Sequence, residues 1–425
     1  MYRHGCIVRL YKREYVIARK PKLVRREKMK KRLFLVIALS LALCFFGTTA
    51  MASKTIKIGG IFDITGGTGS VGTPYAEGVR DYVHYLNDNG GINGMKIELL
   101  DVDYAYKIPQ ALAAYKKFKN AGVVAIQGWG TGDTEAMSPI ITKDHIPYFS
   151  GSYSEHLSNA EVTPYNFLVG TTYADQARVA LKYIATNWKD KSRKPRVALI
   201  YNDTGFGRSP FFDVDYHGHH FPAAEAYAKE VGVDIVDTLV IGLRALDATP
   251  QLLSMKQKDP DYAIVQETSV MATILKDAKK LGLRTKFFAL NWAMSRKIMS
   301  LAGDAAEGCY WTNPFATWDD VHLPGVKKAR EISEKYHPGK VQVVNYFQGY
   351  TAMLVMAEAI SRIKGEVTGE KIKDALENMK DFDTGGLTVP FTFTKKSHKG
   401  SLGLRIYQVR GGKLVPVTGK IIVKR

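Results

Sequence analysis

Cysteine is scarce in this sequence, which contains three in 425 residues, and only Cys309 lies beyond residue 52. A lone cysteine excludes an intramolecular disulfide in the chain after that point. The folded part must therefore be stabilised by packed apolar cores. The 373 residues that follow Ala52 exceed the length at which a single core stops growing, about 250 to 300 residues, so we expect two domains.

Acidic residues are nearly absent from the first 52 positions. This stretch holds 13 of the 60 Lys and Arg residues but only two of the 41 Asp and Glu residues. The remainder has 47 basic and 39 acidic residues, so its net charge is +8, whereas the whole chain carries +19. No arginine-rich stripe or interleaved aromatic motif is present in the remainder, which argues against a nucleic-acid partner.

A membrane-spanning apolar run is also missing from the N-terminal region. Residues 33–46 are apolar except for Ser40, but this run is shorter than the ~20 residues that cross a bilayer. A basic stretch, a short apolar run and then Ala50-Met51-Ala52 are typical of a cleavable signal peptide, so we predict export and cleavage after Ala52. Met29 would make a conventional start for such a peptide, and residues 1–28 are treated as non-structural.

The rest of the chain alternates short β-branched runs with stretches of helical period, which predicts parallel sheets covered by helices. In the first half we expect strands over residues 56–62, 96–102, 123–127 and 146–150, with helices over 74–89, 109–120 and 134–144. The pattern restarts with strands over 196–201, 235–241, 262–266 and 287–291. The fold class is therefore α/β, with two Rossmann-like halves.

The segments after these strands are rich in glycine, hydroxyl and aromatic residues. They are residues 63–70, 128–134 and 151–154 in the first half, and 202–207, 267–269 and 291–292 in the second. Ligands of open α/β sheets bind beyond the carboxyl ends of the strands, and glycines and hydroxyls there bring N–H and O–H donors to an anion. Turn and cap chemistry alone would explain many of these residues one by one. Their recurrence on one face predicts a cleft.

Several of these segments, in this order, resemble the branched-chain amino acid (Leu/Ile/Val-binding) type of periplasmic solute-binding protein of ABC importers. The resemblance extends over residues 54–410 and is carried by Asp63-Ile64-Thr65-Gly66, the turn at 89–94, residues 147–158, Phe206-Gly207 and residues 301–308. It implies a type I periplasmic-binding fold, whose two Rossmann-like lobes are joined by a three-crossover hinge. We place the crossovers near Tyr173, Phe315 and Thr388. The predicted lobes are then residues 53–172 plus 316–387, and residues 173–315 plus 388–425.

The resemblance also implies a ligand site. Hydroxyls at Thr131, Ser152 and Ser154 would hold the ligand carboxylate, and the second lobe would contribute Phe206 and Glu267. An acidic residue that pairs with the ligand ammonium would fall on Asn291. A neutral amide cannot neutralise a desolvated ammonium, so either the ligand is not an α-amino acid or Glu267 forms the ion pair.

Large rings add flat surfaces that suit an aromatic or planar carboxylic acid or amide. We include Trp129, Tyr153, Phe206, Trp292 and Tyr346 among the ligand-binding residues. Trp292 and Tyr346 could instead belong to the core. The predicted ligand is thus a small carboxylate-bearing solute, and the predicted partner is a membrane ABC permease. We expect a periplasmic monomer.

Other motifs point to alternatives. Gly66-Gly67-Thr68-Gly69 suggests a nucleotide-dependent Rossmann-type enzyme, but the third glycine of G-x-G-x-x-G and other catalytic signatures are missing. His217-Gly218-His219-His220 matches no zinc spacing and is better explained as a solvated insertion. A ligand-sensing ectodomain is a third class. We predict a protein that is not an enzyme and uses neither a cofactor nor a metal.

Overall fold

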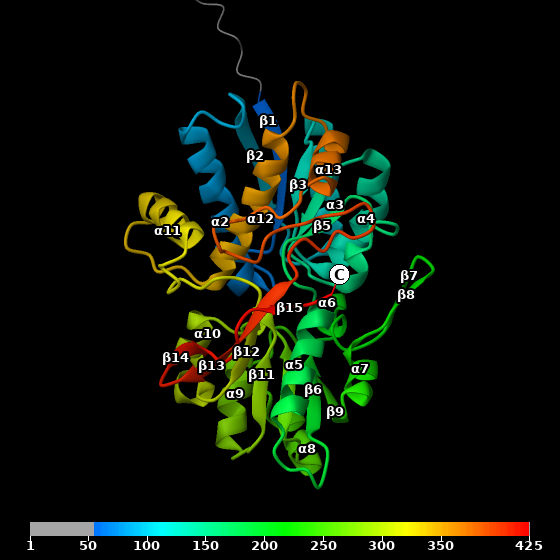
Figure 1. Cartoon of the computed structure of the whole chain (residues 1–425), viewed down its shortest axis with the longest axis vertical. Helices are drawn as coiled ribbons and strands as arrows, with labels where there is room; N and C mark the ends of the chain where they lie inside the picture. Colours follow the sequence, from blue (N-terminus) through cyan, green and yellow to red (C-terminus); the bar gives the residue numbers. More distant parts are fainter. Residues whose placement is uncertain (1–54, 425) are drawn as a thin grey trace, which may run out of the picture. The chain divides into compact units, whose positions relative to one another are not determined.

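The structure, a computed structural model, describes residues 55–424. Its first sheet has five parallel strands in the order β2-β1-β3-β4-β5 (Figure 1). They are β1 (Thr55–Phe62), β2 (Lys96–Asp103), β3 (Ala125–Gln127), β4 (Tyr148–Ser150) and β5 (Asn166–Leu168). The helices on this side are α2 (Gly69–Asp88), α3 (Ile108–Ala121), α4 (Thr131–Asp144), α11 (Pro324–Tyr336), α12 (Val344–Ser361) and α13 (Gly369–Glu377). We refer to this group as the first lobe.

The second sheet follows the order β14-β13-β12-β11-β10-β6-β9, and β15 also pairs with β13. Its strands are β6 (Arg196–Tyr201), β9 (Asp234–Val240), β10 (Tyr262–Gln266), β11 (Lys286–Ala289), β12 (Tyr310–Asn313), β13 (Gly403–Arg410), β14 (Lys413–Pro416) and β15 (Ile421–Ile422). The helices α5 (Tyr173–Asn187), α6 (Gly205–Arg208), α7 (Ala224–Glu230), α8 (Thr249–Lys258), α9 (Met271–Lys280) and α10 (Arg296–Ala302) accompany it. This group is the second lobe.

The predicted α/β class with parallel strands is confirmed in both sheets, because apolar β-branched runs are buried on both faces between helices. The second sheet also has an antiparallel edge that was not predicted, where β13 pairs with β12 and β14. Helix boundaries differ by a few residues: α4 begins at Thr131, three residues before the predicted start. Among residues 55–424, no helix combines the length and the apolar character that crossing a membrane requires.

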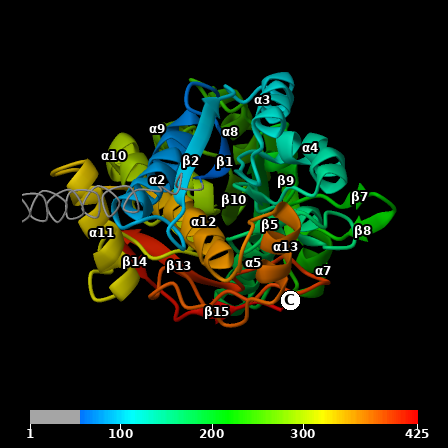
Figure 2. The ribbon, with the colours of Figure 1, turned by 90° about the horizontal axis from the view of Figure 1, so that it is seen from above.

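Helix α12 is apolar on nearly every side and is buried beside α2 (Figure 2). Gly349 of α12 and Gly78 of α2 permit this close approach. A Cβ atom added at Gly349 would lie 1.9 Å from the carbonyl oxygen of Tyr75, and one at Gly78 would lie 2.1 Å from that of Tyr346. The backbones of the two helices are therefore in direct contact. This contact fixes the position of α2, and α2 carries Tyr75.

The chain passes between the lobes three times. The first passage leads from β5 into α5, and the second leads from β12 toward α11. The sequence predicts the third near Thr388, and we propose that it follows Gly400, because residues 397–400 bond to the first lobe: the N–H of His398 donates to the carbonyl of Ser158 at 2.7 Å, and that of Gly400 donates to the carbonyl of Leu168 at 3.0 Å. The His398 ring is also stacked on Phe167. The precise lobe boundaries stay a proposal.

Candidate ligand-binding site

Loops at the carboxyl ends of strands from both sheets enclose a small cavity. The first lobe contributes Thr68, Val71, Tyr106, Trp129, Gly130, Thr131, Gly151 and Ser152, and the second contributes Tyr173, Phe206, Thr268 and Trp292. The cavity volume is about 20 Å³, which is room for little more than one water molecule. The predicted strand-end segments of both halves therefore meet around one cavity, which is nearly filled by its own side chains in this arrangement.

Three buried hydroxyls form a triangle on the first-lobe side of the cavity. The Oγ1 of Thr131 lies 2.6 Å from the Oγ of Ser152 and 3.2 Å from that of Ser154, and the two serine oxygens are 3.0 Å apart. Thr131 and Ser152 line the cavity, whereas Ser154 stands behind them. Thr131 is also the first residue of α4, where free N–H groups favour an anion. The arrangement suits a carboxylate.

Hydrogen bonds hold two indole rings in the walls of the cavity. The Nε1 of Trp129 donates to Thr68 Oγ1 at 2.8 Å, and that hydroxyl donates to Asp63 at 2.6 Å. The Nε1 of Trp292 donates to the hydroxyl of Tyr173 at 2.8 Å. The two indoles meet edge to face, 5.2 Å apart. Trp292, from the second lobe, therefore lies among rings of the first.

Tyr153 and Phe206 complete the aromatic group from opposite lobes. Tyr153 is fully buried behind the cavity and stacks on Trp292 at 5.7 Å. Phe206 lines the cavity and meets Tyr173 edge to face at 5.6 Å. Five of the ten residues predicted to bind the ligand thus line the cavity, namely Trp129, Thr131, Ser152, Phe206 and Trp292.

Asn291 and Glu267 lie at the ends of neighbouring strands in the second lobe and are both fully buried. The Nε2 of Gln176 donates to Asn291 Oδ1 at 3.0 Å, but Asn291 Nδ2 has no partner. Neither carboxylate oxygen of Glu267 meets the geometry of a full hydrogen bond. Burial raises the pKa of Glu267 well above its usual value, and the Asn202 side chain and the Thr268 backbone N–H lower it by less.

Tyr346 is one of the five predicted residues that do not line the cavity, together with Tyr153, Ser154, Glu267 and Asn291. It lies on α12, where its hydroxyl donates to Asp81 of α2 at 2.9 Å. Its ring is buried beside Tyr350 in the interface of the two helices. The packing of α12 against α2 decides this placement, and a single sequence does not reveal which helices are neighbours.

Four residues of the cavity wall were not among the predicted ligand-binding residues: Tyr106, Tyr173, Thr68 and Thr268, of which the last two lie within the predicted strand-end segments. Tyr106 follows β2, and both it and Ala105 have positive φ angles, of 57° and 50°. Non-glycine residues rarely adopt this conformation, which is frequent at functional sites. Tyr106 follows the predicted strand at 96–102, so its place at the end of a parallel strand is the sequence signal for this residue.

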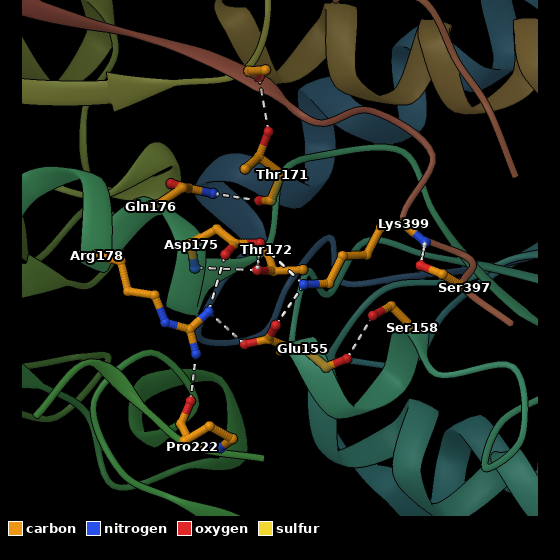
Figure 3. A network of polar contacts seen from close by, with 11 residues as sticks. Glu155, Ser158, Thr171, Thr172, Asp175, Gln176, Arg178, Pro222, Ser397 and Lys399 are labelled. Carbon is orange, nitrogen blue, oxygen red and sulfur yellow. Dashed lines mark hydrogen bonds and ion pairs between the residues drawn. The ribbon is translucent and has the colours of Figure 1, made fainter. Parts of the chain in front are cut away.

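A buried ionic network joins two of the chain passages beside the cavity (Figure 3). Glu155, in the loop after β4, accepts from Arg178 of α5 at 2.9 Å and from Lys399. Asp175 of α5 accepts from the same two cations, at 3.0 Å from Arg178 and 3.2 Å from Lys399. Burial lowers the pKa of Arg178, but Glu155 and Asp175 raise it by more. These contacts fix the hinge in the observed arrangement.

The histidine-rich segment forms a hairpin, with strands β7 (Val214–Tyr216) and β8 (His219–Phe221). His220 contacts Asp213 and Asp215 at 3.4 and 2.9 Å. Within residues 55–424, no group of three or more His, Cys, Asp or Glu side chains is arranged to hold a metal ion.

Comparison with known proteins gives the family. The sequence profile of the family described as Periplasmic binding protein matches residues 55–413. The chain belongs to the periplasmic binding proteins. The branched-chain resemblance is confirmed by the Leucine-, isoleucine-, valine-, threonine-, and alanine-binding protein of Pseudomonas aeruginosa, which is 26% identical over 357 residues, 82% of this chain and 89% of the relative. Leu/Ile/Val-binding protein homolog 7 of Brucella suis is 25% identical over 400 residues, 90% of this chain and 96% of the relative.

Solved structures agree with this periplasmic binding protein fold. A branched-chain amino acid ABC transporter protein from Thermus thermophilus, described with bound valine, has a TM-score of 0.79 and 28% identity, and the match covers 87% of this chain and 97% of that one. An ABC transporter substrate-binding protein from Aeropyrum pernix has a TM-score of 0.80 and 28% identity, with coverage of 88% and 97%. The predicted type I periplasmic-binding fold is confirmed.

Proposed function

We propose that this periplasmic binding protein captures a small carboxylate-bearing solute between its lobes and delivers it to a membrane ABC permease. The observation that carries the proposal is the hydroxyl triangle of Thr131, Ser152 and Ser154, which faces aromatic side chains of the other lobe across the cavity. Donors on one lobe and rings on the other give a carboxylate with an apolar body contacts to both lobes at once. Such a solute stabilises the closed arrangement.

The names of the relatives add a narrower possibility, since several are described as binding leucine, isoleucine or valine. We keep the broader class of small carboxylates because Asn291 stands where an ammonium-binding acid was expected. Export by a signal peptide with cleavage after Ala52 remains part of the proposal, and it concerns residues outside the described part of the chain. The proposal also includes a monomeric protein that does not catalyse a reaction of its solute.

A thermal-shift screen of amino acids, aromatic acids and short amide-bearing acids on residues 53–425 tests the proposal. A solute present at 100 times its dissociation constant stabilises the folded state by about 2.7 kcal/mol. At least one carboxylate should raise the melting temperature, and chromatography should recover it unchanged after incubation. No shift across the screen contradicts solute capture, and conversion of the solute would favour an enzyme.

A further inference from the structure

Three neighbouring strands of the second sheet, β6, β10 and β11, are each followed by a buried polar residue at the carboxyl end. In the parallel register Tyr201 is opposite Gln266, and Val265 is opposite Ala289. Continued by one or two residues, this register aligns Asn202, Glu267 and Asn291 side by side. All three are at most 1% exposed, and the next residue after Glu267, Thr268, lines the cavity. The row therefore lies at the ligand end of the sheet.

Only some of the polar atoms in the side chains of Asn202, Glu267 and Asn291 form hydrogen bonds within the protein. The amide of Asn202 donates to the carbonyl of Gln266 at 3.3 Å, and its oxygen accepts from Thr204. Neither oxygen of Glu267 makes a full hydrogen bond, although the Asn202 side chain and the Thr268 N–H interact with its carboxyl group, and the Nδ2 of Asn291 has no partner. Buried polar groups are normally hydrogen-bonded, so adjacent unsatisfied groups indicate a missing partner. Within residues 55–424, no Lys, Arg or His forms an ion pair with Glu267.

We propose that the solute carries an uncharged amide-type group at the end opposite its carboxylate, with its N–H on Glu267 and its C=O on Asn291 Nδ2. A carboxyl and an amide N–H side by side offer an acceptor and a donor, which an amide matches with two hydrogen bonds. An ammonium would match only Glu267 and would leave Asn291 Nδ2 unsatisfied. The raised pKa of Glu267 agrees with a neutral partner. This inference rests on the proposed function and narrows its ligand class.

Two matched pairs of probes test it by calorimetry: succinamate against 4-aminobutyrate, and 4-carbamoylbenzoate against 4-(aminomethyl)benzoate. The amide should bind at least ~10-fold more tightly than the amine in a pair, because a site built for a hydrogen-bonded group rejects the analogue that cannot form those bonds. Glu267→Gln should keep the amide's affinity within about threefold, since glutamine also accepts an N–H, whereas Glu267→Leu should weaken it ~10-fold or more. Glu225→Gln, at an exposed position, is the control.

The outcomes separate this inference from the proposed function. Tighter binding of the amines, with their affinity lost in Glu267→Gln, overturns the amide assignment and leaves solute capture intact. Binding of other carboxylates in the thermal-shift screen, with neither amide bound, also overturns it. If no carboxylate of any kind binds, the proposed function itself fails.

A second and independent observation concerns the hairpin of β7 and β8. It projects outward from the second lobe (Figure 1), and the Tyr216 hydroxyl of β7 donates to the carbonyl oxygen of Glu135 on α4 of the first lobe. The turn at His217 and Gly218, with φ angles of 48° and 79°, makes it a tight two-residue hairpin. At the base of the hairpin, the carbonyl of Pro222 accepts a hydrogen bond from Arg178, a member of the ionic network with Glu155, Asp175 and Lys399. The hairpin is thus anchored in one lobe and reaches the other.

The contact with the first lobe is aromatic and mostly buried. His156, which is 2% exposed, lies 5.0 Å from the ring of Tyr216 and 6.1 Å from that of Phe221. Its Nε2 is 2.8 Å from Glu135 Oε1, and the Tyr216 hydroxyl donates to the carbonyl oxygen of Glu135 at 3.3 Å. Residues that cover His156 therefore come from the opposite lobe, and separation of the lobes would expose it.

We infer that the hairpin is a clasp that holds the lobes in the closed arrangement. Single-molecule energy transfer between dyes on Lys116→Cys and Gln257→Cys, exposed positions on α3 and α8, reports the distance between the lobes without any ligand. Tyr216→Ala should raise the ratio of molecules with the longer inter-lobe distance to those with the shorter one by ~5-fold or more, because one buried hydrogen bond and its ring contacts are lost. His220→Ala, on the exposed side of the hairpin, should change nothing. An unchanged distribution in Tyr216→Ala overturns the clasp.

Discussion

The ring of Tyr153 stacks on the indole of Trp292 with 5.7 Å between centroids and 21° between planes, although the two residues follow strands of different sheets. Tyr75 and Trp129 also contact Trp292, at 6.5 and 5.2 Å. One side chain of the second lobe is therefore surrounded by three rings of the first. Because Trp292 also lines the cavity, the same side chain contributes both to the contact between the lobes and to the ligand site.

Truncation of Trp292 should weaken both properties. Loss of a buried tryptophan typically costs about 3–5 kcal/mol of unfolding free energy, so Trp292→Ala should lower the urea midpoint and also weaken solute binding. Trp188→Ala provides the matched control, because Trp188 is only partly buried and lies at the end of α5, away from the cavity. Equal losses in the two variants would contradict the special position of Trp292.

The hydroxyl triangle should carry the affinity for carboxylates. In Thr131→Val with Ser152→Ala, two donors are lost while the shape of the wall is largely kept, and we expect a loss of ~10-fold or more in affinity because hydrogen bonds to charged groups contribute about 1.5–3 kcal/mol each. Calorimetry with the strongest carboxylate of the screen measures this loss. Ser254→Ala, at an exposed serine of α8, is the control, and undiminished binding in the double variant would show that the carboxylate lies elsewhere.

The ionic network of Glu155, Asp175, Arg178 and Lys399 should make the free energy of unfolding depend on Lys399 but not on the nearby Lys396. Lys399→Met leaves Glu155 and Asp175 with Arg178 as their remaining cation, and removal of one partner from a buried ionic group costs about 3–5 kcal/mol. Chemical denaturation should therefore show a large loss. Lys396→Met, at an exposed position, should be nearly neutral, and the same small effect from both would mean that the network adds no stability.

His398 should make the stability depend on pH. Burial lowers its pKa below the usual 6.5, and its contacts with Glu377 and Asn166 raise it by less. The unfolded chain then binds the proton at a higher pH than the folded chain, so this contribution is complete above pH ~6.5 and falls as the pH drops below that value. Denaturation between pH 7.5 and 5 should show a smaller decline in His398→Gln than in the parent, and parallel declines would contradict this role.

The contact between α2 and α12 should not tolerate a methyl group. Gly349→Ala would place a Cβ atom 1.9 Å from the Tyr75 carbonyl oxygen, which forces the helices apart, and we expect a loss of about 3 kcal/mol or more. At Gly242 an added Cβ meets nothing within 4 Å, so Gly242→Ala should be neutral. Thermal denaturation compares the two, and similar melting temperatures would show that the helices can separate at little cost.

Much of the fold follows from the sequence because it depends on local patterns. The period-2 and period-3.6 alternation defines βα units, and glycines and hydroxyls mark the strand ends that meet in the cleft. These patterns identify the segments that contain Trp129, Thr131, Ser152, Phe206 and Trp292, and the family resemblance implies the roles of Thr131, Ser152 and Phe206 within them. What could not be predicted depends on contacts between distant segments. The antiparallel strand β13 is one example, because its pairing with β12 is set by the chain's third passage.

Tyr346 and the hairpin illustrate the same limit at the site. Tyr346 has a large amphipathic side chain of the kind that often lines pockets. Its helix, however, packs on α2, and its hydroxyl donates to Asp81. Residues 217–220 of the histidine-rich segment are exposed, as expected of an insertion in solvent, but the flanking Tyr216 and Phe221 cover His156 of the other lobe. In both cases the neighbour is remote in sequence, and no local pattern encodes it.

The most direct test of the account is a crystal structure of the protein grown with the strongest-binding carboxylate of the screen. The account predicts density for the solute in the cavity, with its carboxylate on the hydroxyls of Thr131 and Ser152 and its body against Trp129, Phe206 and Trp292. A solute bound outside this cavity, or bound within it with its carboxylate turned away from those hydroxyls, would contradict the account.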